Sequence, residues 1–379
     1  PYKYKSMPKL ILSPVGTSLF TNLAGDKRRL INENANALED EISKKTKQLV
    51  IRYENQVQSL FKENNIDKLK RASAELNSLL TLYDNRFVGH QRDIHVLVTT
   101  DTYLGKKAAY NLKVYLKQYF DVVLVYTPVK LSTRTKEHFD SGIRNLLKWC
   151  DENINNYKES GYEVVFNLTG GFKSLQGYLN TIGMFYADEI VYIFEQGSEL
   201  ISIPRLPVSM ETDLFREQAQ IFLLLSQTNE GIQKSRLTSI PEIMVEEYQN
   251  DRYILSNWGE LSWNNAKEEV LSQRLMALPR IAYLDSFKTD FKNTQRPRDK
   301  VVLQETIAFI SCRLQESDGD ISILKAGRSG GILYDNYTGR NSHLGHFRIG
   351  RGLRVSCEYK NEILELRHYG EHDYVNDNP

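Results

Sequence analysis

Short apolar runs alternate with longer stretches of helical spacing through the first half of the chain. We expect these runs to be strands, at residues 10–12, 94–98, 122–126, 164–166 and 190–194. Between the first two runs, residues 26–82 are poor in Gly and Pro and repeat apolar residues at helical spacing, which predicts two or three amphipathic helices. Strands that alternate with helices predict a doubly wound, Rossmann-like parallel sheet.

The pattern changes after Pro204 and Pro207, which lack a backbone donor and interrupt the periodic spacing. Beyond them, residues 215–225, 243–253 and 264–278 have the spacing of helices, and Trp258 and Trp263 are expected on either side of a turn. These segments predict a helical middle domain.

The chain from Pro279 onward predicts a different architecture. A short strand at 280–283 precedes a short helix at 286–292 and a longer one at 300–316, and four strand candidates follow, at 321–324, 345–349, 353–359 and 363–369. Two helices on one face of an antiparallel sheet form a small α+β domain. We therefore expect a multidomain chain, α/β plus α+β, divided into residues 7–208, 209–278 and 279–379.

Residues 167–174, Asn-Leu-Thr-Gly-Gly-Phe-Lys-Ser, lie between an expected strand and an expected helix. Glycines let the backbone approach an anion, and a helix start offers free N–H groups beside the charge of Lys173. This pattern favours a phosphate or nucleotide cradle, although a tight turn with a solvated lysine has the same pattern. The glycine spacing excludes a Walker A loop.

Two other strand ends carry hydroxyls, glycines and lysines, and ligands of parallel sheets bind where such ends meet. The expected ligand-binding residues are Ser13, Gly16, Thr17, Ser18, Thr100, Asp101, Lys106, Asn167, Thr169, Gly170, Gly171, Phe172 and Lys173.

Histidines and arginines are concentrated in the last segment, which holds four of the seven histidines. Cleaving RNA without a metal requires a base for the ribose 2′-OH, cations around the phosphorane and an acid for the leaving oxygen, and His and Arg suit these tasks. Strand alternation should point Phe347 into the core and its neighbours His346 and Arg348 to the opposite face. The expected catalytic residues are His346, Arg348, Arg354, His368, His372 and Tyr374.

Composition limits the expected cellular location of the protein and its expected binding partners. No apolar run approaches the ~20 residues that span a bilayer, the first six residues are unlike a signal peptide, and we expect a cytoplasmic protein without a membrane partner. Cys150, Cys312 and Cys357 are isolated, so neither a disulfide framework nor a zinc site is expected, and no carboxylate cluster has metal-ligand spacing. A net charge of +1 and the lack of a basic helix face in residues 209–278 argue against DNA as a partner.

Residues 13–19, with Gly-Thr-Ser, and residues 167–174, with Thr-Gly-Gly-Phe-Lys, resemble the paired ligand motifs of CARF domains, the cyclic oligoadenylate sensors of type III CRISPR defence. The resemblance covers about the first 205 residues. It implies a homodimer whose two crevices form one basin for a two-fold symmetric RNA ring, with cyclic tetra-adenylate as the expected activator and no other cofactor. It also implies that residues 209–278 form a winged-helix-like module.

Residues 347–355, Phe-Arg-Ile-Gly-Arg-Gly-Leu-Arg-Val, and the ending Gly-Glu-His-Asp-Tyr at 370–374 resemble the RelE and ParE toxin superfamily. The resemblance covers residues 279–379. It aligns Arg348 with a basic residue of the family's cleft strand, Arg354 with its core arginine and Tyr374 with its catalytic tyrosine. His368 stands where the family has an arginine, which leaves the assignment of acid and base open.

Together the two resemblances imply a CRISPR-associated mRNA interferase. Its activator would be cyclic oligoadenylate, and its substrate mRNA in the ribosomal decoding site, cut by attack of the 2′-OH. Two alternatives stay open: a ligand-responsive transcription regulator with an inactive toxin fold, and a sensor that degrades its own ring with help from Ser13, Thr17 or Lys173.

Overall fold

The computed structural model describes residues 7–194, 199–205, 212–325, 332–350 and 352–379. The chain divides into two compact units, residues 1–208 (unit 1) and 209–379 (unit 2). The predicted boundary at 208–209 and Pro207 lie outside the described residues.

Unit 1 is built on a six-stranded sheet with the order β3-β2-β1-β4-β5-β6. Its strands are β1 (Lys9–Val15), β2 (Ile94–Thr99), β3 (Val122–Tyr126), β4 (Glu163–Asn167), β5 (Glu189–Ile193) and β6 (Leu200–Pro204). The first five are parallel, as the sequence predicts, and β6 adds an antiparallel edge that the sequence pattern did not reveal. Leu10, Ile11 and Leu12 are fully buried, because helices cover both faces of the sheet.

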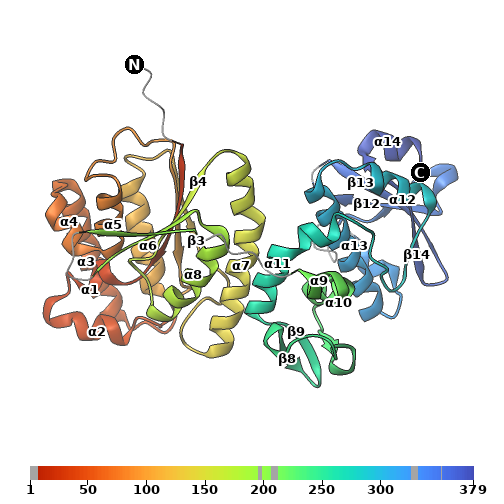
Figure 1. Cartoon of the computed structure of the whole chain (residues 1–379). Coiled ribbons are helices and arrows are strands. Elements are labelled where there is room, and N and C mark those ends of the chain that lie inside the picture. Colours follow the sequence, from red (N-terminus) through yellow and green to blue (C-terminus); the bar gives the residue numbers. More distant parts are fainter. Residues whose placement is uncertain (1–6, 195–198, 206–211, 326–331, 351) are drawn as a thin grey trace, which may run out of the picture. The chain divides into compact units, whose positions relative to one another are not determined.

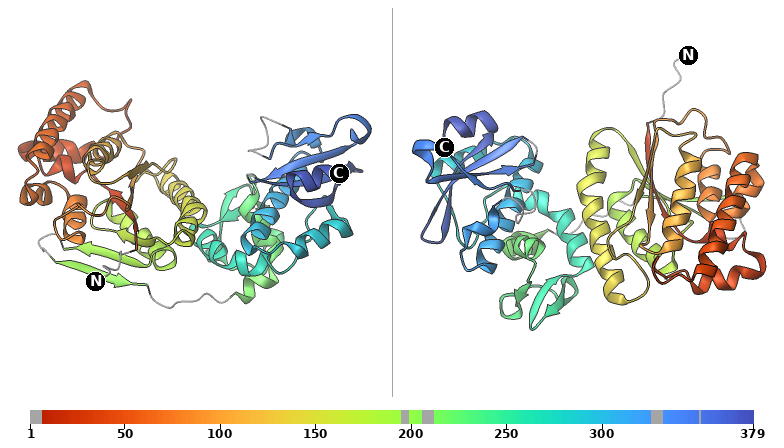
Figure 2. Two further views of the ribbon diagram at one scale, coloured as in Figure 1. Left: turned by 90° about the horizontal axis from the view of Figure 1, so that it is seen from above. Right: turned by 180° about the vertical axis from the view of Figure 1, so that it is seen from behind.

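Helices α3–α6 lie on one face of this sheet, and α7 and α8 lie on the other (Figures 1 and 2). The helices are α1 (Ser18–Thr21), α2 (Arg28–Glu33), α3 (Lys44–Glu63), α4 (Ile66–Ala72), α5 (Ala74–Leu82), α6 (Tyr103–Leu116), α7 (Lys136–Glu159) and α8 (Lys173–Tyr186), with a 3-10 turn at Gly25–Lys27. Five of them begin after a side chain that accepts from the N–H three residues later, which satisfies a donor of the first turn; these caps are Ser43, Asn65, Ser73, Thr102 and Thr135.

The first half of unit 2 corrects the predictions for its first two helices. The expected helix 215–225 is two helices, α9 (Asp213–Glu217) and α10 (Ala219–Gln227). The expected helix 243–253 is wrong, since this segment forms a hairpin of β8 (Val245–Gln249) and β9 (Arg252–Leu255), with β7 (Ile232–Gln233) on the other side of β9. Asn250 and Asp251 both have positive φ, 43° and 62°, and such residue types close a two-residue hairpin turn.

Helix α11 (Asn257–Leu271) contains both Trp258 and Trp263, so the expected turn between them is wrong. The helix begins seven residues before the predicted start at 264, because the Ser256 hydroxyl accepts from the N–H of Gly259 and caps it there. Trp263 is fully buried and stacks on Phe222 of α10. Two 3-10 turns, Lys234–Arg236 and Glu242–Met244, complete this region.

The second half of unit 2 carries a five-stranded sheet with the order β10-β14-β13-β12-β11. Its strands are β10 (Ile281–Tyr283), β11 (Asp335–Asn336), β12 (Leu344–Ile349), β13 (Leu353–Lys360) and β14 (Ile363–Glu371). Its helices are α12 (Asp285–Asn293), α13 (Pro297–Glu316) and α14 (His372–Asp377), with a 3-10 turn at Gly339–Asn341. The β10–β14 pair is parallel and the other pairs are antiparallel.

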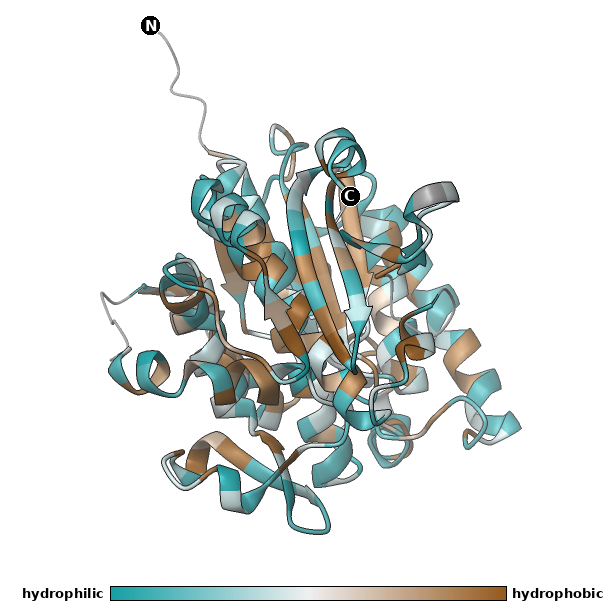
Figure 3. Cartoon of the chain, turned by 90° about the vertical axis from the view of Figure 1, so that its right-hand side faces the viewer, coloured by the Kyte–Doolittle hydropathy of each residue, from teal (hydrophilic) through white to brown (hydrophobic). Residues whose placement is uncertain are grey.

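The expected strand 321–324 is wrong, because Ile321–Leu324 is a 3-10 helix that the carboxylate of Asp320 caps by accepting from the N–H of Ser322. Figure 3 shows hydrophilic and hydrophobic residues alternating along the sheet that follows it. One hydrophobic cluster includes Phe222 and Trp263 from the first half of the unit and Ile307, Phe347 and Leu366 from the second. The predicted division of this part of the chain into two domains stays a prediction.

All three cysteines are buried and unpaired. Burial raises the pKa of the Cys312 thiol to about 12 and also raises the pKa values of Cys150 and Cys357. Among the described helices, none is both long and apolar enough to cross a membrane.

His95 of β2 should make the stability of unit 1 depend on pH. Its ring is fully buried between Phe120 and Tyr83, and burial lowers its pKa to about 3. The unfolded chain binds a proton near pH 6.5 and the native chain does not, so stability is full above pH 6.5 and falls below it, by about 2 kcal/mol between pH 7.5 and pH 5. Calorimetric melting of His95→Gln should show that this part of the pH slope is lost. The matched control, His138→Gln at the half-buried third residue of α7, should keep it.

Candidate functional site

The two glycine-containing loops of unit 1 meet where the strand order reverses. The chain crosses from β1 to β2 and β3 on one side of the sheet, and β4 lies on the other side of β1, so the loops after β1 and β4 face each other at the switch point. A Cβ on Gly16 would lie only 3.2 Å from the backbone nitrogen of Gly171, and Gly171 has φ +94° with Pro14 behind it. The contact is therefore backbone against backbone, and Gly171 tolerates no side chain without strain.

A buried carboxylate organises the first loop. Glu75, in the first turn of α5, is 1% exposed and accepts from the N–H of Gly16 and the hydroxyl of Ser18, both at 2.8 Å. The hydroxyl of Ser73 donates to the same carboxylate at 2.7 Å. A Cβ on Gly170 would collide with Glu75 at 2.3 Å, so this side chain lies against both loops.

The second loop is held by α8. Gln176 donates from its amide nitrogen to the carbonyls of Leu168 and Gly170, at 3.1 and 3.0 Å, and the hydroxyl of Thr169 accepts from the N–H of Ile193. No side chain caps the start of α8, which begins at Lys173. The N–H groups of its first turn therefore face the loop, as in anion-binding helix starts.

A cavity of about 690 Å³ opens at this point. Among the predicted residues it is lined by Gly16, Thr17, Ser18, Thr169, Gly170, Gly171 and Lys173. Three further cations, Arg28, Lys70 and Arg71, also line it, whereas no Asp or Glu is among the described lining residues. The described wall of the cavity thus carries four positive side chains, with the single carboxylate of Glu75 buried behind its loops, and this excess of positive charge suits a polyanionic ligand.

The remaining predicted ligand residues do not line this cavity. Ser13 and Asn167 are fully buried, and the Asn167 amide donates to the Ser13 hydroxyl at 3.2 Å, which ties the ends of β1 and β4 together. Thr100 is buried against Thr102, the N–H of Asp101 donates to the carbonyl of Leu131, and Lys106 is exposed on α6. Phe172 immediately precedes α8.

Several lining residues were missed by the sequence reasoning. Arg28, Lys70 and Arg71 come from α2 and α4, in a region interpreted there as a solvated helical face because both charge signs are interleaved. Phe194, 57% exposed, also lines the cavity and adds an aromatic side chain to its wall. Only the close approach of α2 and α4 to the loop of β1 reveals them.

In unit 2, the register of the sheet brings predicted catalytic residues into rows. His346 of β12 lies opposite Ser356 of β13, which lies opposite His368 of β14, and Arg348 lies opposite Arg354 in the next row. Phe347, between the two β12 residues, is fully buried on the other face. The outer face of this sheet therefore gathers two histidines and two arginines.

An irregularity in β14 determines where His368 points. Cys357 pairs with Leu366, but Ser356 pairs with His368, so Arg367 is an extra residue in β14. Side chains alternate along a regular strand, and without this bulge His368 would point to the core with Leu364 and Leu366. The bulge turns it to the outer face.

His368 belongs to a three-residue group with Asp290 and Tyr374. The Nδ1 atom of His368 lies 3.2 Å from Asp290 Oδ2 and 3.2 Å from the Tyr374 hydroxyl, and this hydroxyl donates to Asp290 Oδ1 at 3.0 Å. Burial, followed by the bond to Asp290, raises the pKa of Tyr374, so its phenol stays protonated. Asp290, on α12, was not among the predicted site residues, because its separation of 78 positions from His368 leaves no local signal.

Arg354 and His372 are joined through another residue that the sequence reasoning missed, Asn376. Arg354, 7% exposed, donates to the Asn376 side-chain oxygen at 2.5 Å, and the Asn376 amide lies 3.2 Å from the ring nitrogens of His372. Burial and the charge of Arg354 lower the pKa of His346, which keeps that ring neutral. The described structure gives no partner to three buried polar atoms on this face, Nδ1 of His346, Nε of Arg354 and Oγ of Ser356.

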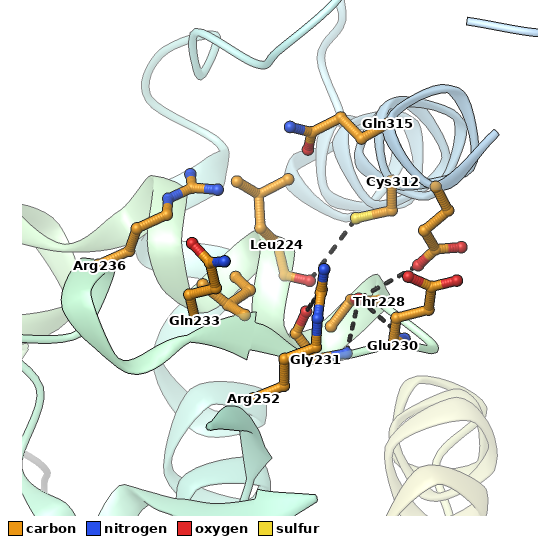
Figure 4. Close-up of a pocket in the computed structure, with 11 residues that line it drawn as sticks. Leu224, Thr228, Glu230, Gly231, Gln233, Arg236, Arg252, Cys312 and Gln315 are labelled. Carbon is orange, nitrogen blue, oxygen red and sulfur yellow. Dashed lines mark hydrogen bonds between the residues drawn. The ribbon is translucent and has the colours of Figure 1, made fainter. Parts of the chain in front are cut away.

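Among the cavities of unit 2, one of about 250 Å³ contains none of the predicted site residues (Figure 4). Arg252 lines it and donates to the carbonyl of Gly231 at 2.9 Å, and Thr228 donates to Glu316 at 3.2 Å. These bonds join the turn after α10 to β9 and α13. Within the described residues, no group of three or more His, Cys, Asp and Glu side chains could hold a metal ion.

Comparisons with known proteins give one partial family match. No curated protein matches the chain. Among solved structures, Enterococcus italicus Csm6 bound to cyclic hexa-2′-fluoro-hexa-dAMP aligns with 14% identity and a TM-score of 0.29, over 82% of this chain and 62% of that one. The chain thus spans less than two thirds of the length of that protein, and a TM-score of this size establishes no common fold. Residues 70–206, less than half of the chain, match the family model described as CRISPR-associated protein (Cas_APE2256).

Proposed function

We propose that the chain is an endoribonuclease of type III CRISPR defence that cyclic oligoadenylate activates. The similarity of residues 70–206 to a CRISPR-associated family supports the assignment to CRISPR defence. The observation that carries the enzyme assignment is the gathering of His346, Arg354, His368 and Tyr374 on one face of a sheet.

The proposed ligand site is the cavity between the loops after β1 and β4. A cyclic oligoadenylate carries one negative phosphate per nucleotide, and the cavity offers Arg28, Lys70, Arg71 and Lys173 together with the start of α8. In the proposal, a homodimer joins two such cavities around one two-fold symmetric ring, and cyclic tetra-adenylate is the activator. Activation requires the ring to bind the active arrangement of the dimer more tightly than the resting one.

The proposed reaction is cleavage of mRNA, bound to the ribosome, without a metal. His368 takes the proton of the ribose 2′-OH, and the 2′-oxygen attacks the adjacent phosphorus. Arg354 and Arg348 stabilise the charge of the phosphorane, and the P–O5′ bond breaks to leave a 2′,3′-cyclic phosphate. His372 is the candidate to protonate the 5′-oxygen, because the Tyr374 hydroxyl, kept a phenol by its raised pKa, donates its proton to Asp290.

Cleavage should depend on both the ring and the proposed catalytic face. Translating ribosomes with end-labelled mRNA should show cuts only with cyclic tetra-adenylate, and His368→Ala or Arg354→Ala should slow them about 100-fold or more, the typical contribution of an acid–base or electrostatic group. His343→Ala, exposed in the loop before β12, is the matched control and should cut at the wild-type rate. Tight ring binding without cleavage would favour a transcription regulator, and a degraded ring would favour a ring nuclease.

Ring binding should depend on the cations of the cavity. Lys173→Ala and Arg71→Ala should each weaken binding about 10-fold at physiological salt and reduce its salt dependence, because each removes a charge that faces phosphate. Titration calorimetry measures both effects. Lys62→Ala, exposed near the end of α3, should bind the ring as the wild type does, and a similar loss there would contradict the placement of the site.

Two glycines near the start of α8 should respond in opposite ways to alanine. Gly171→Ala should weaken ring binding at least about 10-fold and lower the melting temperature, because φ +94° and the nearby Pro14 leave no strain-free place for a Cβ. Gly177→Ala lies in open space on the helix and should stabilise unit 1 by about 0.5–1 kcal/mol with binding unchanged. Unchanged binding of cyclic tetra-adenylate by Gly171→Ala would show that the site does not require the close contact between the two loops.

A further inference from the structure

We propose that Asp290 is a positioning residue that fixes the orientation and the tautomer of His368 for proton transfer, an inference that rests on the proposed ribonuclease function. Asp290 lies on α12, far from His368 in sequence, and its side chain is 14% exposed. Both of its carboxylate oxygens are engaged by the catalytic face or by the strand that carries it.

The donors and acceptors around His368 determine which of its ring nitrogens carries the proton. Asp290 Oδ1 accepts the only proton of the Tyr374 hydroxyl, at 3.0 Å, and an ionised carboxylate can only accept. The His368 Nδ1 atom, 3.2 Å from Asp290 Oδ2 and from the Tyr374 oxygen, therefore faces two acceptors. A neutral imidazole in this place must carry its proton on Nδ1, which leaves the lone pair on Nε2.

The carboxylate is itself fixed to the strand. Oδ2 also accepts from the backbone N–H of Tyr369 at 3.0 Å, next to His368. Helix α12 lies along the edge of β14 beyond the end of β10, where the N–H of Leu284 donates to the carbonyl of Leu366 and the hydroxyl of Ser286 donates to that of Arg367. These three hydrogen bonds hold Asp290 opposite the bulge at Arg367 that turns His368 outward.

The proposed role follows from this arrangement. The 2′-OH proton moves to Nε2 of His368 while Nδ1 keeps its own, so the ring becomes a cation beside the Asp290 carboxylate. That carboxylate stabilises the imidazolium that forms during the step. The 2′-oxygen bonds to phosphorus as the 5′-oxygen leaves, and the 5′-oxygen takes one proton from an acid, so protons and bonds balance.

The first test measures the tautomer and needs no cleavage. In the full-length protein labelled with ¹⁵N-histidine, the correlation spectrum of the neutral His368 ring, assigned with His368→Ala, should show the proton on Nδ1. In Asp290→Ala it should move mainly to Nε2, the form preferred in water. A wild-type ring protonated on Nε2 would overturn the proposal.

The second test is a double-mutant cycle that measures mRNA cleavage activated by cyclic tetra-adenylate, under single-turnover conditions. Asp290→Ala should slow the cleavage step about 10- to 100-fold with little change in the mRNA concentration that half-saturates it, and should cost less than about 3-fold in the His368→Ala background. Equal losses in both backgrounds would show a merely structural role. Asp290→Asn, which keeps an oxygen for the Tyr369 N–H, takes the place of Asp290→Ala if that variant does not fold.

Asp285→Ala is the matched control, because this carboxylate begins the same helix but is 97% exposed and pairs with Lys288. It should leave both the tautomer and the rate unchanged. If the wild type does not cut mRNA at all, the proposed function fails, whereas the tautomer of His368 still decides whether Asp290 positions the ring.

Discussion

Parallel strands can be joined only by crossovers that pass over one face of their sheet, and this constraint creates the cavity of unit 1. The chain leaves β1 toward β2 and β3, and β4 returns on the opposite side of β1, so the loops after β1 and β4 diverge from a common edge. Gly16 and Gly171 let the two loops touch by their backbones, and Glu75 supplies acceptors for the donors that this contact leaves buried. The charges of Arg28, Lys70, Arg71 and Lys173 gather around a frame that topology and two glycines already hold in place.

The outer face of the sheet in unit 2 depends on register in a similar way. The regular pairing of β12 and β13 places His346 and Ser356 in one row. His368 of β14 joins that row only because Arg367 is an extra residue in its strand. Because β10 ends opposite Leu366, the next residues of β14 are bonded by α12, which brings a carboxylate to His368 and to the Tyr369 N–H together. Core packing of Phe347, Val355 and Tyr369 on the inner face fixes the row against slipping.

Periodicity was sufficient for the parallel sheet, because its strands are buried on both faces and stand out as apolar runs bounded by helices. It failed for the hairpin Val245–Leu255, where exposed and half-buried positions mix and the left-handed turn at Asn250 and Asp251 carries the signal. Local motifs located Gly16, Gly171 and Lys173 at one cavity. Asp290, Asn376, Glu75 and Arg71 could not be found in this way, since each joins its site through contacts between elements far apart along the chain.

The three buried thiols make the protein suitable for site-specific labelling. A thiolate is the reactive form of cysteine, and burial keeps Cys150, Cys312 and Cys357 as inert thiols. A cysteine introduced on an exposed helix can therefore carry a dye or spin label without replacement of the native residues. Pairs of such labels, one in each unit, would give distances between the units with and without a ring in an otherwise unaltered chain.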